Sequence, residues 1–348
     1  MSFLIQRLKD LGLLKDTDFS ICSVGAGIYE EDDFESSWYT LGSQLTIFGF
    51  EPNPYEFQRL VENYNEQKPA YNVVYFNKAV SQRSEPVILN VASSPPCSSI
   101  YQPNDDYCER ICLYATNSGK EYSFDKMSKA TQVISKVQFQ STTLDEELPE
   151  ATILDFLKID VQGADLDVLI GGEKKVLPNL LALQIEIELN PLYIDQPLFG
   201  DIDSYLRKQG LSILDFRTAR RLRSIAPVFD SRNQGWAGQL LWGDAIYFRD
   251  LVAYPEEHPL KTPKNLLKLA CVLSCLWGNA FIDIALESLI YLATHYGDLT
   301  NRYFEIAEIA KEIFCHPDYG LGLTLAEAEN TEAIQMIRSA KELAEQLS

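Results

Sequence analysis

The chain has 348 residues, of which 46% are hydrophobic and 23% charged, and its formal net charge is −20. This composition is typical of a soluble globular protein with one large domain or two ordinary ones. The strong negative charge argues against a nucleic-acid partner, because phosphate backbones are bound by clustered Lys and Arg. The one basic cluster, at 217–223, is short, and we interpret it as a solvated turn or an anion-contacting loop.

Seven cysteines and three histidines limit the expected metal and redox chemistry. The cysteine count is odd, the positions are scattered and no signal peptide is evident, so we expect reduced thiols and a cytoplasmic protein. Cys108 and Cys112 lie one helical turn apart, as do Cys271 and Cys275. For both pairs, buried small hydrophobes are favoured over a metal or redox pair. The histidines show no ligand spacing, so we expect no metal site, and no apolar run is long enough for a membrane span.

In chain order, the first predicted element is an amphipathic N-terminal helix with Phe3, Leu4, Leu8 and Leu11 on one face. From about 19 to 250, apolar strands alternate with helices, which predicts a mostly parallel α/β sheet covered on both faces. Strands are expected at Phe19–Val24, Leu45–Phe50, Asn72–Phe76, Ile153–Ile159, Leu181–Ile187, Leu211–Phe216 and Ala245–Phe248. Helices are expected at Tyr55–Tyr64, Ala164–Leu177 and Asp201–Gln209.

The first strand leads into Gly25-Ala26-Gly27, and the second ends on Glu51, where nucleotide-binding α/β folds place a ribose-binding acid. No Lys-Ser/Thr pair follows the glycines, which excludes a P-loop. The acids at 30–33 would repel a pyrophosphate but not a positive sulfonium, so they favour S-adenosylmethionine over a dinucleotide. In the alternative interpretation these acids only cap the next helix.

A long insertion is predicted between about 82 and 141, where the alternation weakens. It begins with a turn-rich patch at 95–99, which is followed by several tyrosines. Long loops in compact domains are often functional, so one interpretation is a lid over the site. The other is a surface excursion without a role.

The stretch ILDFLKIDVQGADLDVLIGG, at 153–172, predicts a buried strand that ends on Asp160 and a helix that begins at about Ala164. Ligands bind outside the carboxyl ends of strands in open α/β sheets, so Asp160 stands where chemistry is expected. Lys158 is two residues earlier and leaves the strand on the same face. Glu186 and Glu188 share a face at the end of the next strand, and one or both are expected to line the same crevice.

After 250 the strand signal ends. A Pro- and Glu-rich linker at 255–259 precedes helical patterns at Lys264–Trp277, Phe281–His295, Arg302–Phe314 and Thr324–Leu347. We therefore predict one α/β domain at 1–252 and a helical domain at 253–348. Packing of these helices on the first domain is expected, and half of a homodimer interface is the alternative.

Five motifs resemble those of the FkbM-type S-adenosylmethionine-dependent methyltransferases, in family order. They are SVGAG at 23–27, FGFEPNP at 48–54, VVYFNKAVS at 73–81, TTLDEEL at 142–148 and DFLKIDVQGADLDVLIGG at 155–172. LQIEIELNPLYIDQPLFGDIDSYLRKQG at 183–210 and GQLLWGDAIYFRD at 238–250 resemble one branch of that family. The resemblance implies the Rossmann-like class I methyltransferase fold, a seven-stranded, mostly parallel sheet whose last strand is antiparallel. It does not cover the helical tail.

The resemblance implies S-adenosylmethionine as cofactor and a hydroxyl of a sugar or another small molecule as acceptor. Together with the residue pattern, it assigns cofactor contacts to Ser23, Gly25, Ala26, Gly27, Glu30, Glu51, Pro52, Asn77, Lys78, Ala79 and Asp160. It assigns acceptor contacts to Ser98, Ser99, Gln162 and Glu186.

Methyl transfer requires alignment of the acceptor oxygen, methyl and sulfur, and removal of the hydroxyl proton. Asp160 is the candidate base, and Lys158 either lowers its pKa or orients a substrate oxygen. Alternatively, Asp160 only binds backbone or the cofactor amine. The chain departs from the family pattern at Ser23, at Tyr29 and at Gln162, where the family has Glu. Because the last departure removes a candidate base, the alternative function is a catalytically silent binding or scaffold protein.

Overall fold

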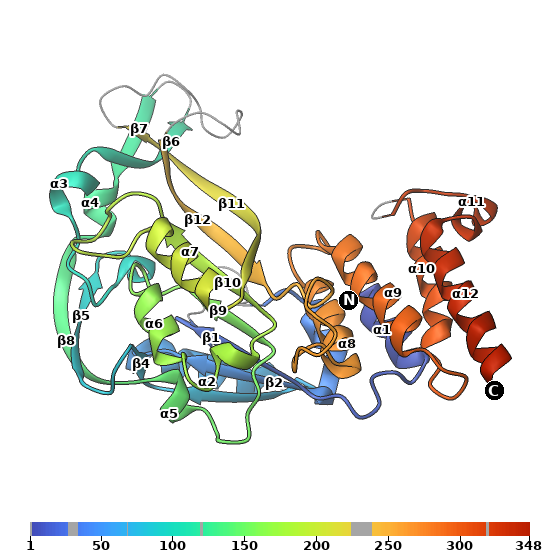
Figure 1. The fold of residues 1–348 in the computed structure, drawn as a ribbon. Coiled ribbons are helices and arrows are strands. Elements are labelled where there is room, and N and C mark those ends of the chain that lie inside the picture. Colours follow the sequence, from blue (N-terminus) through green and yellow to red (C-terminus); the bar gives the residue numbers. More distant parts are fainter. Residues whose placement is uncertain (1, 27–33, 68, 119–120, 224–238, 318–319) are drawn as a thin grey trace.

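The computed structural model describes residues 2–26, 34–67, 69–118, 121–223, 239–317 and 320–348 (Figure 1). Within these ranges the chain forms a long sheet flanked by helices, with a group of C-terminal helices beside it (Figure 1). The N-terminal helix α1 (Phe3–Asp10) lies next to that group, as its apolar face predicts, with Leu4, Ile5 and Leu8 buried.

The central sheet carries the candidate site, and its strand order is β3-β2-β1-β9-β10-β12-β11-β6-β7. The first seven strands are β3 (Asn72–Phe76), β2 (Leu45–Phe50), β1 (Phe19–Val24), β9 (Phe156–Ile159), β10 (Ala182–Glu188), β12 (Gln239–Phe248) and β11 (Ser212–Arg223). β12 runs antiparallel to both of its neighbours, and the other pairs from β3 to β10 are parallel. This order, with an antiparallel last strand, confirms the predicted class I methyltransferase fold.

The sheet contains two strands more than the seven expected. β6 (Ile111–Ser118) and β7 (Glu121–Lys126) form a hairpin within the insertion, and β6 pairs with the end of β11. An edge strand offers unpaired backbone groups, and the hairpin satisfies those at the end of β11. The rest of the insertion contains β5 (Pro86–Ala92), α3 (Asp105–Cys108), α4 (Met127–Ala130) and β8 (Val133–Thr142), and β4 (Ala79–Val80) and β5 flank β8 in a separate sheet.

Alternation along the strands builds a core on each face of the sheet. In β9, Phe156 lies in one apolar cluster, whereas Leu157 and Ile159 lie in the other. The second cluster also contains residues of α6 (Asp165–Gly171) and α7 (Phe199–Lys208). The remaining helices of this part are α2 (Pro54–Gln67), α5 (Leu144–Glu147) and short 3₁₀ turns at Trp38–Gln44, Pro95–Cys97 and Leu177–Asn179.

The C-terminal helices are α8 (Pro263–Leu273), α9 (Ile282–Tyr296), α10 (Ile306–Cys315), α11 (Leu325–Glu329) and α12 (Glu332–Leu347), with a 3₁₀ turn at Tyr303–Glu305. The last predicted helix is therefore divided, since helix α11 ends before Asn330. Leu269 and Leu289 belong to the same core as Phe156, so these helices pack on the sheet. On α12, Leu343 and Leu347 are exposed, and a homodimer through this helix stays a prediction.

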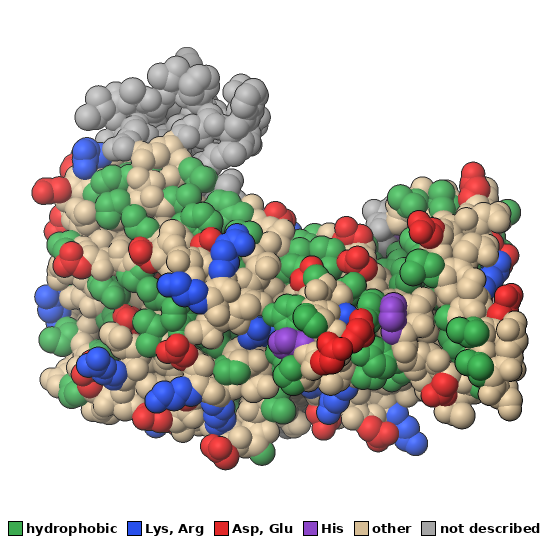
Figure 2. Space-filling view, in the orientation of Figure 1, with side chains coloured by type: hydrophobic (Ala, Val, Ile, Leu, Met, Phe, Trp, Pro, Cys, Tyr) green, Lys and Arg blue, Asp and Glu red, His purple; other side chains and the backbone are tan. Residues whose placement is uncertain are grey.

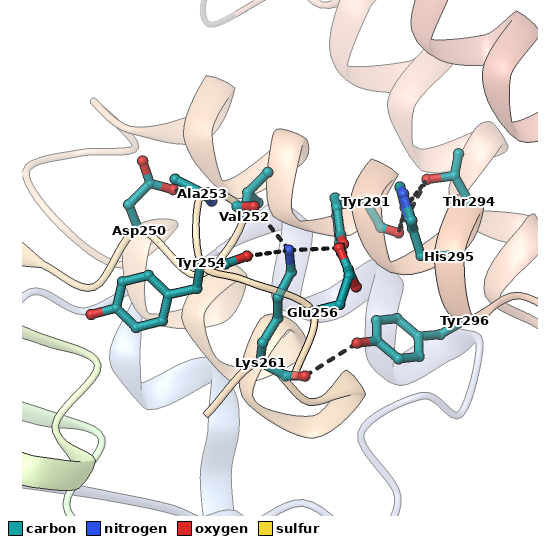
Figure 3. Close-up of polar contacts among 10 residues, drawn as sticks. All are labelled: Asp250, Val252, Ala253, Tyr254, Glu256, Lys261, Tyr291, Thr294, His295 and Tyr296. Carbon is teal, nitrogen blue, oxygen red and sulfur yellow. Dashed lines mark hydrogen bonds and ion pairs between the residues drawn. The ribbon is translucent and has the colours of Figure 1, made fainter. Parts of the chain in front are cut away.

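The side chain of Lys261 contacts the segment that connects β12 with the C-terminal helices (Figure 3). Its ammonium donates hydrogen bonds to the carbonyl oxygens of Val252 at 3.0 Å and Tyr254 at 2.7 Å. It also pairs with Glu256 at 3.0 Å and lies 4.3 Å from the centre of the Tyr291 ring. These contacts hold the connecting segment against α9, in addition to the apolar core.

Figure 2 shows acidic and basic side chains scattered over one face of the molecule rather than gathered in a basic patch. In the described part of the chain, no helix has the length and apolar character needed to cross a membrane. The seven cysteines all lie in the described part of the chain and are present as thiols, not as disulfides.

Candidate functional site

A pocket of about 300 Å³ opens where β1, β2 and β9 end. Nine of the sequence-predicted residues line it: Gly25, Glu51, Pro52, Lys78, Ala79, Ser98, Lys158, Asp160 and Gln162. The carboxyl ends of neighbouring parallel strands meet at one edge of the sheet, which brings these distant segments together. The volume is at the lower end of the range found for small-molecule sites.

Gly25 forms the floor of the pocket between two strands. Its φ is +89°, and a Cβ placed on it would lie 2.1 Å from the carbonyl oxygen of Asp160, so only glycine fits. The backbone N–H groups of Gly25 and Ala26 both donate to the carbonyl oxygen of Phe50, at 3.0 and 3.1 Å. The turn is therefore held against the end of β2 as well as the end of β9.

Glu51 follows β2 and is buried, with 6% of its surface exposed. Its Oε1 accepts a hydrogen bond from the backbone N–H of Asn53 at 2.7 Å. Asn77 does not line the pocket, but its Nδ2 donates to the carbonyl oxygens of Glu51 and Pro52 at 2.8 and 3.1 Å. Asn77 thus fixes the backbone that carries Glu51. Lys78 does line the pocket, and its Nζ pairs with Glu147 at 2.6 Å.

Asp160 and Glu186 are joined by the side-chain amide of Gln162. The Nε2 of Gln162 donates to Oδ1 of Asp160 at 2.8 Å and to Oε2 of Glu186 at 2.5 Å. The hydroxyl of Tyr193 is 3.2 Å from the Oε1 of the same amide. Glu186 therefore contacts the site through Gln162 and does not itself line the pocket.

Charged residues continue across the sheet beside Glu186. In the strand register Glu186 pairs with Asp244 of β12, and Asp244 pairs with Arg217 of β11. The guanidinium group of Arg217 lies over the Trp277 ring, 4.0 Å from its centre, in a cation–π contact. One row of side chains on the sheet thus runs from the pocket toward the helical part.

The acids of this region hold protons more tightly than ordinary carboxyls. Burial, and then the charge of Asp160, raise the pKa of Asp165 to about 7. Burial also raises the pKa of Glu186 and of Glu188 well above the ordinary value, and raises that of Asp244. In the described part of the chain, the buried Oε2 of Glu188 has no hydrogen-bond partner. These acids therefore release their protons at a higher pH than ordinary carboxyl groups do.

Ser23 lies inside the sheet rather than at the pocket. It is buried in β1, beside Lys158 in the register, and its hydroxyl has no hydrogen-bond partner within the described residues. Ala26 is likewise buried behind the glycine turn and is not among the lining residues of the described chain.

The insertion forms one wall of the pocket. Pro95, Pro96 and Ser98 line it, and the backbone N–H of Ala92 donates to Oγ of Ser98 at 3.1 Å. Ser99 is buried, and its hydroxyl donates to the backbone carbonyl oxygen of Gln162 at 2.6 Å. The insertion thus touches the turn that follows Asp160, while its role as a moving lid stays a prediction.

Two predicted cofactor residues, Gly27 and Glu30, and the departure at Tyr29 lie outside the described residues. Four further residues, which were not predicted from the sequence, line the pocket or contact the amide of Gln162: Asn53, Leu89, Ile100 and Tyr193. Asn53 stands in the FGFEPNP motif and could have been found there, whereas Leu89 and Ile100 reach the pocket only through the path of the insertion. Among the described residues, no group of three or more His, Cys, Asp or Glu is arranged to hold a metal ion.

Comparison with known proteins gives one family. Residues 23–213 match the family model described as the methyltransferase FkbM domain. A search of curated proteins found no match. Among solved structures, an S-adenosylmethionine-dependent methyltransferase from Clostridium acetobutylicum is 8% identical, with 71% of this chain and 89% of that chain covered and a TM-score of 0.31. A variant of the 16S rRNA adenine methyltransferase from Catenulisporales acidiphilia is 12% identical, with 70% and 93% covered and a TM-score of 0.30. At such scores the fold assignment rests on the strand order.

Proposed function

Because the chain belongs to the FkbM methyltransferase family, we propose that it transfers the methyl group of S-adenosylmethionine to a hydroxyl of a small-molecule acceptor, with a saccharide as the expected class. The observation that carries the proposal is the pocket in which Gly25, Glu51 and Asp160 meet. In this pocket the glycine turn after β1 meets the acid that follows β2, Glu51, and the acid that follows β9, Asp160.

The residues present fit the proposed cofactor. The turn at Gly25 has no space for a side chain, and such close backbone approaches are typical of nucleotide-binding turns. The carboxylate of Glu51 stands where ribose hydroxyls are bound in α/β folds, and its backbone is held by Asn77. We expect Gly25, Glu51, Asn53 and Ala79 to hold the cofactor, which when bound supplies a methyl group on a positively charged sulfur.

Asp160 is the residue that we expect to accept the proton of the acceptor hydroxyl. Its Oδ1 is engaged by Gln162, and its Oδ2 accepts no hydrogen bond in the described part of the chain. In the proposed step, Oδ2 of Asp160 would take the proton of the acceptor hydroxyl. The bound cofactor would supply the methyl group, its carbon–sulfur bond breaking as the bond from the acceptor oxygen to the methyl carbon forms. Proton removal of this kind contributes roughly 10²–10⁴-fold to a rate.

Lys158 lies in β9 and lines the pocket, as does Asp160, which directly follows that strand. An ammonium group there favours negative charge on the acceptor oxygen as its proton leaves. We therefore propose that Lys158 orients the acceptor hydroxyl. Ser98 and the insertion wall supply further contacts for a polar acceptor.

The test is binding followed by transfer. Titration calorimetry with S-adenosylmethionine is expected to show binding, and methyl-labelled cofactor is expected to label a hydroxylated acceptor in a saccharide panel. Asp160→Asn is expected to abolish labelling while it leaves cofactor affinity nearly unchanged. Binding without labelling of any acceptor would support the catalytically silent alternative, and unchanged turnover in Asp160→Asn would remove Asp160 as the base.

A further inference from the structure

Gln162 has an unusual backbone conformation and an unusual number of contacts. Its φ is 57°, a left-handed conformation that a residue with a side chain seldom adopts. Its side chain contacts Asp160, Glu186 and Tyr193, and its carbonyl oxygen accepts from Ser99. Conformations of this kind persist where the surroundings fix them, and they cluster at functional sites.

The contacts fix which way the amide of Gln162 points. An amide has one acceptor atom and one donor atom, and the donor faces the oxygens of Asp160 and Glu186. The acceptor faces the hydroxyl of Tyr193, whose single proton is shared between Gln162 and the carbonyl oxygen of Cys97, 3.1 Å away. A flipped amide would turn its oxygen toward two carboxyl groups. Tyr193 therefore links the insertion to the amide orientation.

We propose that Gln162 is a positioning residue that holds Asp160 and Glu186 as one hydrogen-bonded pair, and that contacts with the insertion through Tyr193 and Ser99 fix it in place. The proposal deepens the methyltransferase function proposed above and rests on it for its catalytic meaning. A glutamate at this position would place a third carboxyl group against the other two, which the uncharged amide avoids.

The uncharged amide of Gln162 matters because most of the charged groups around Asp160 and Glu186 are acids. Besides Asp160 itself, the titratable groups that act on Glu186 are Asp165 of α6, Glu188 of β10, Asp244 of β12 and Tyr193, and Asp244 in turn feels Lys158 of β9 and Arg217 of β11. Acids outnumber bases in this set, so an added carboxylate raises the proton affinity of its neighbours. With Oδ1 of Asp160 held by the amide, the other oxygen is left for the pocket.

Gln162→Glu is the first variant, and Gln140→Glu on the exposed face of β8 is its control for added charge. The side-chain ¹³C shift of Glu186, assigned with Glu186→Gln, is followed against pH in the full-length chain. We expect Gln162→Glu to raise the titration midpoint of Glu186 by roughly one pH unit or more, and Gln140→Glu to leave it in place. An unmoved midpoint in Gln162→Glu would overturn the pairing.

Tyr193→Phe tests the link to the insertion, with Tyr101→Phe as the matched control. Tyr101 also joins the insertion to α6, since its hydroxyl donates to Asp167 at 3.1 Å, but it does not touch Gln162. We expect Tyr193→Phe to move the Glu186 midpoint and to lower kcat roughly tenfold at unchanged cofactor affinity, as loss of one oriented hydrogen bond does. Tyr101→Phe is expected to do neither, and equal effects of the two variants would refute the link.

The two proposals fail in distinguishable ways. If Glu186 shifts as expected but wild-type protein methylates no acceptor, the pairing stands and the methyltransferase function falls. If wild-type protein is active and Gln162→Glu leaves the Glu186 midpoint unchanged, the function stands and the positioning role falls.

Discussion

Lys268 of α8 and Asp155, the residue before β9, form a buried ion pair. The Nζ of Lys268 lies 2.9 Å from both carboxylate oxygens, and the two side chains are only 8% and 2% exposed. Asp155 also accepts a hydrogen bond at 2.9 Å from the backbone N–H of Ser20 in β1. The helical part is thus tied by charge, as well as by apolar packing, to the strand that leads to Asp160.

Lys268→Met is expected to lower the free energy of unfolding by about 3–5 kcal/mol, because it leaves the Asp155 carboxylate buried without its cation. Urea denaturation measures the loss, with Lys208→Met on the exposed face of α7 as the control, because the charge of Lys264 in α8 also acts on Asp155. Asp155→Asn combined with Lys268→Met is expected to recover part of the stability. A loss no larger than that of the control would mean that the ion pair does not secure the helices.

Gly25→Ala is expected to reduce both stability and cofactor binding. The new Cβ would lie 2.1 Å from the carbonyl oxygen of Asp160, so the end of β9 must move. Gly12→Ala is the matched control, because Gly12 also has a positive φ, +75°, but a Cβ there would meet no atom within 4 Å. Calorimetry with S-adenosylmethionine and thermal denaturation of both variants compare the effects. Equal losses would show that backbone strain alone, and not the approach to Asp160, requires glycine at 25.

Apolar patterning predicted the first three strands of the chain closely, because β1 and β2 are almost entirely buried and β3 carries an apolar run although it is partly exposed. β1, β2 and β3 have the bounds expected from their apolar runs, Phe19–Val24, Leu45–Phe50 and Asn72–Phe76. The strand β8 was not predicted, since most of its side chains are exposed and its pattern carries little apolar signal. The β6–β7 hairpin was missed for a different reason. Its pairing with β11 joins residues far apart in sequence, which local patterns do not encode.

The candidate site was predicted in part. Gly25, Glu51 and Asp160 could be predicted because each follows a strand, and the carboxyl edge of the sheet can be inferred from the order of β and α elements. The sequence placed Glu186 in the crevice, whereas the structure shows it reaching the site through Gln162. The contacts of Tyr193 depend on the tertiary path of the loop after β10, and no spacing in the sequence indicates them.

The stability of the protein is expected to fall as the pH rises from about 5 to 7. Burial raises the pKa of Asp165 to about 7, and raises those of Glu186 and Glu188 well above the ordinary value. These acids titrate near 4 in an unfolded chain, so between these pH values the folded chain binds more protons and loses stability as the pH rises. Asp165 alone contributes on the order of 4 kcal/mol at most.

Urea denaturation at several pH values between 5 and 8 checks this trend, and Asp165→Asn is expected to flatten it. Acids with lowered pKa values, such as Asp298 and Glu327, add stability with the opposite pH dependence, but they titrate below this range. A free energy of unfolding that rises with pH between 5 and 7 would contradict the raised pKa values of the acids beside Asp160.

Glu51→Gln is expected to weaken S-adenosylmethionine binding by about 1.5–3 kcal/mol, the contribution of a hydrogen bond to a charged group. The amide retains an oxygen that can accept from the N–H of Asn53, so the turn is expected to persist and thermal stability to change little. Glu56→Gln is the matched control, because Glu56 is also buried near the end of β2 but pairs with Arg59 at 2.8 Å and does not line the pocket. Calorimetry on the three proteins separates a ribose contact from a general effect of charge. If both variants bind the cofactor as wild type does, Glu51 supports only the turn, and the ribose must be held by other residues of the pocket.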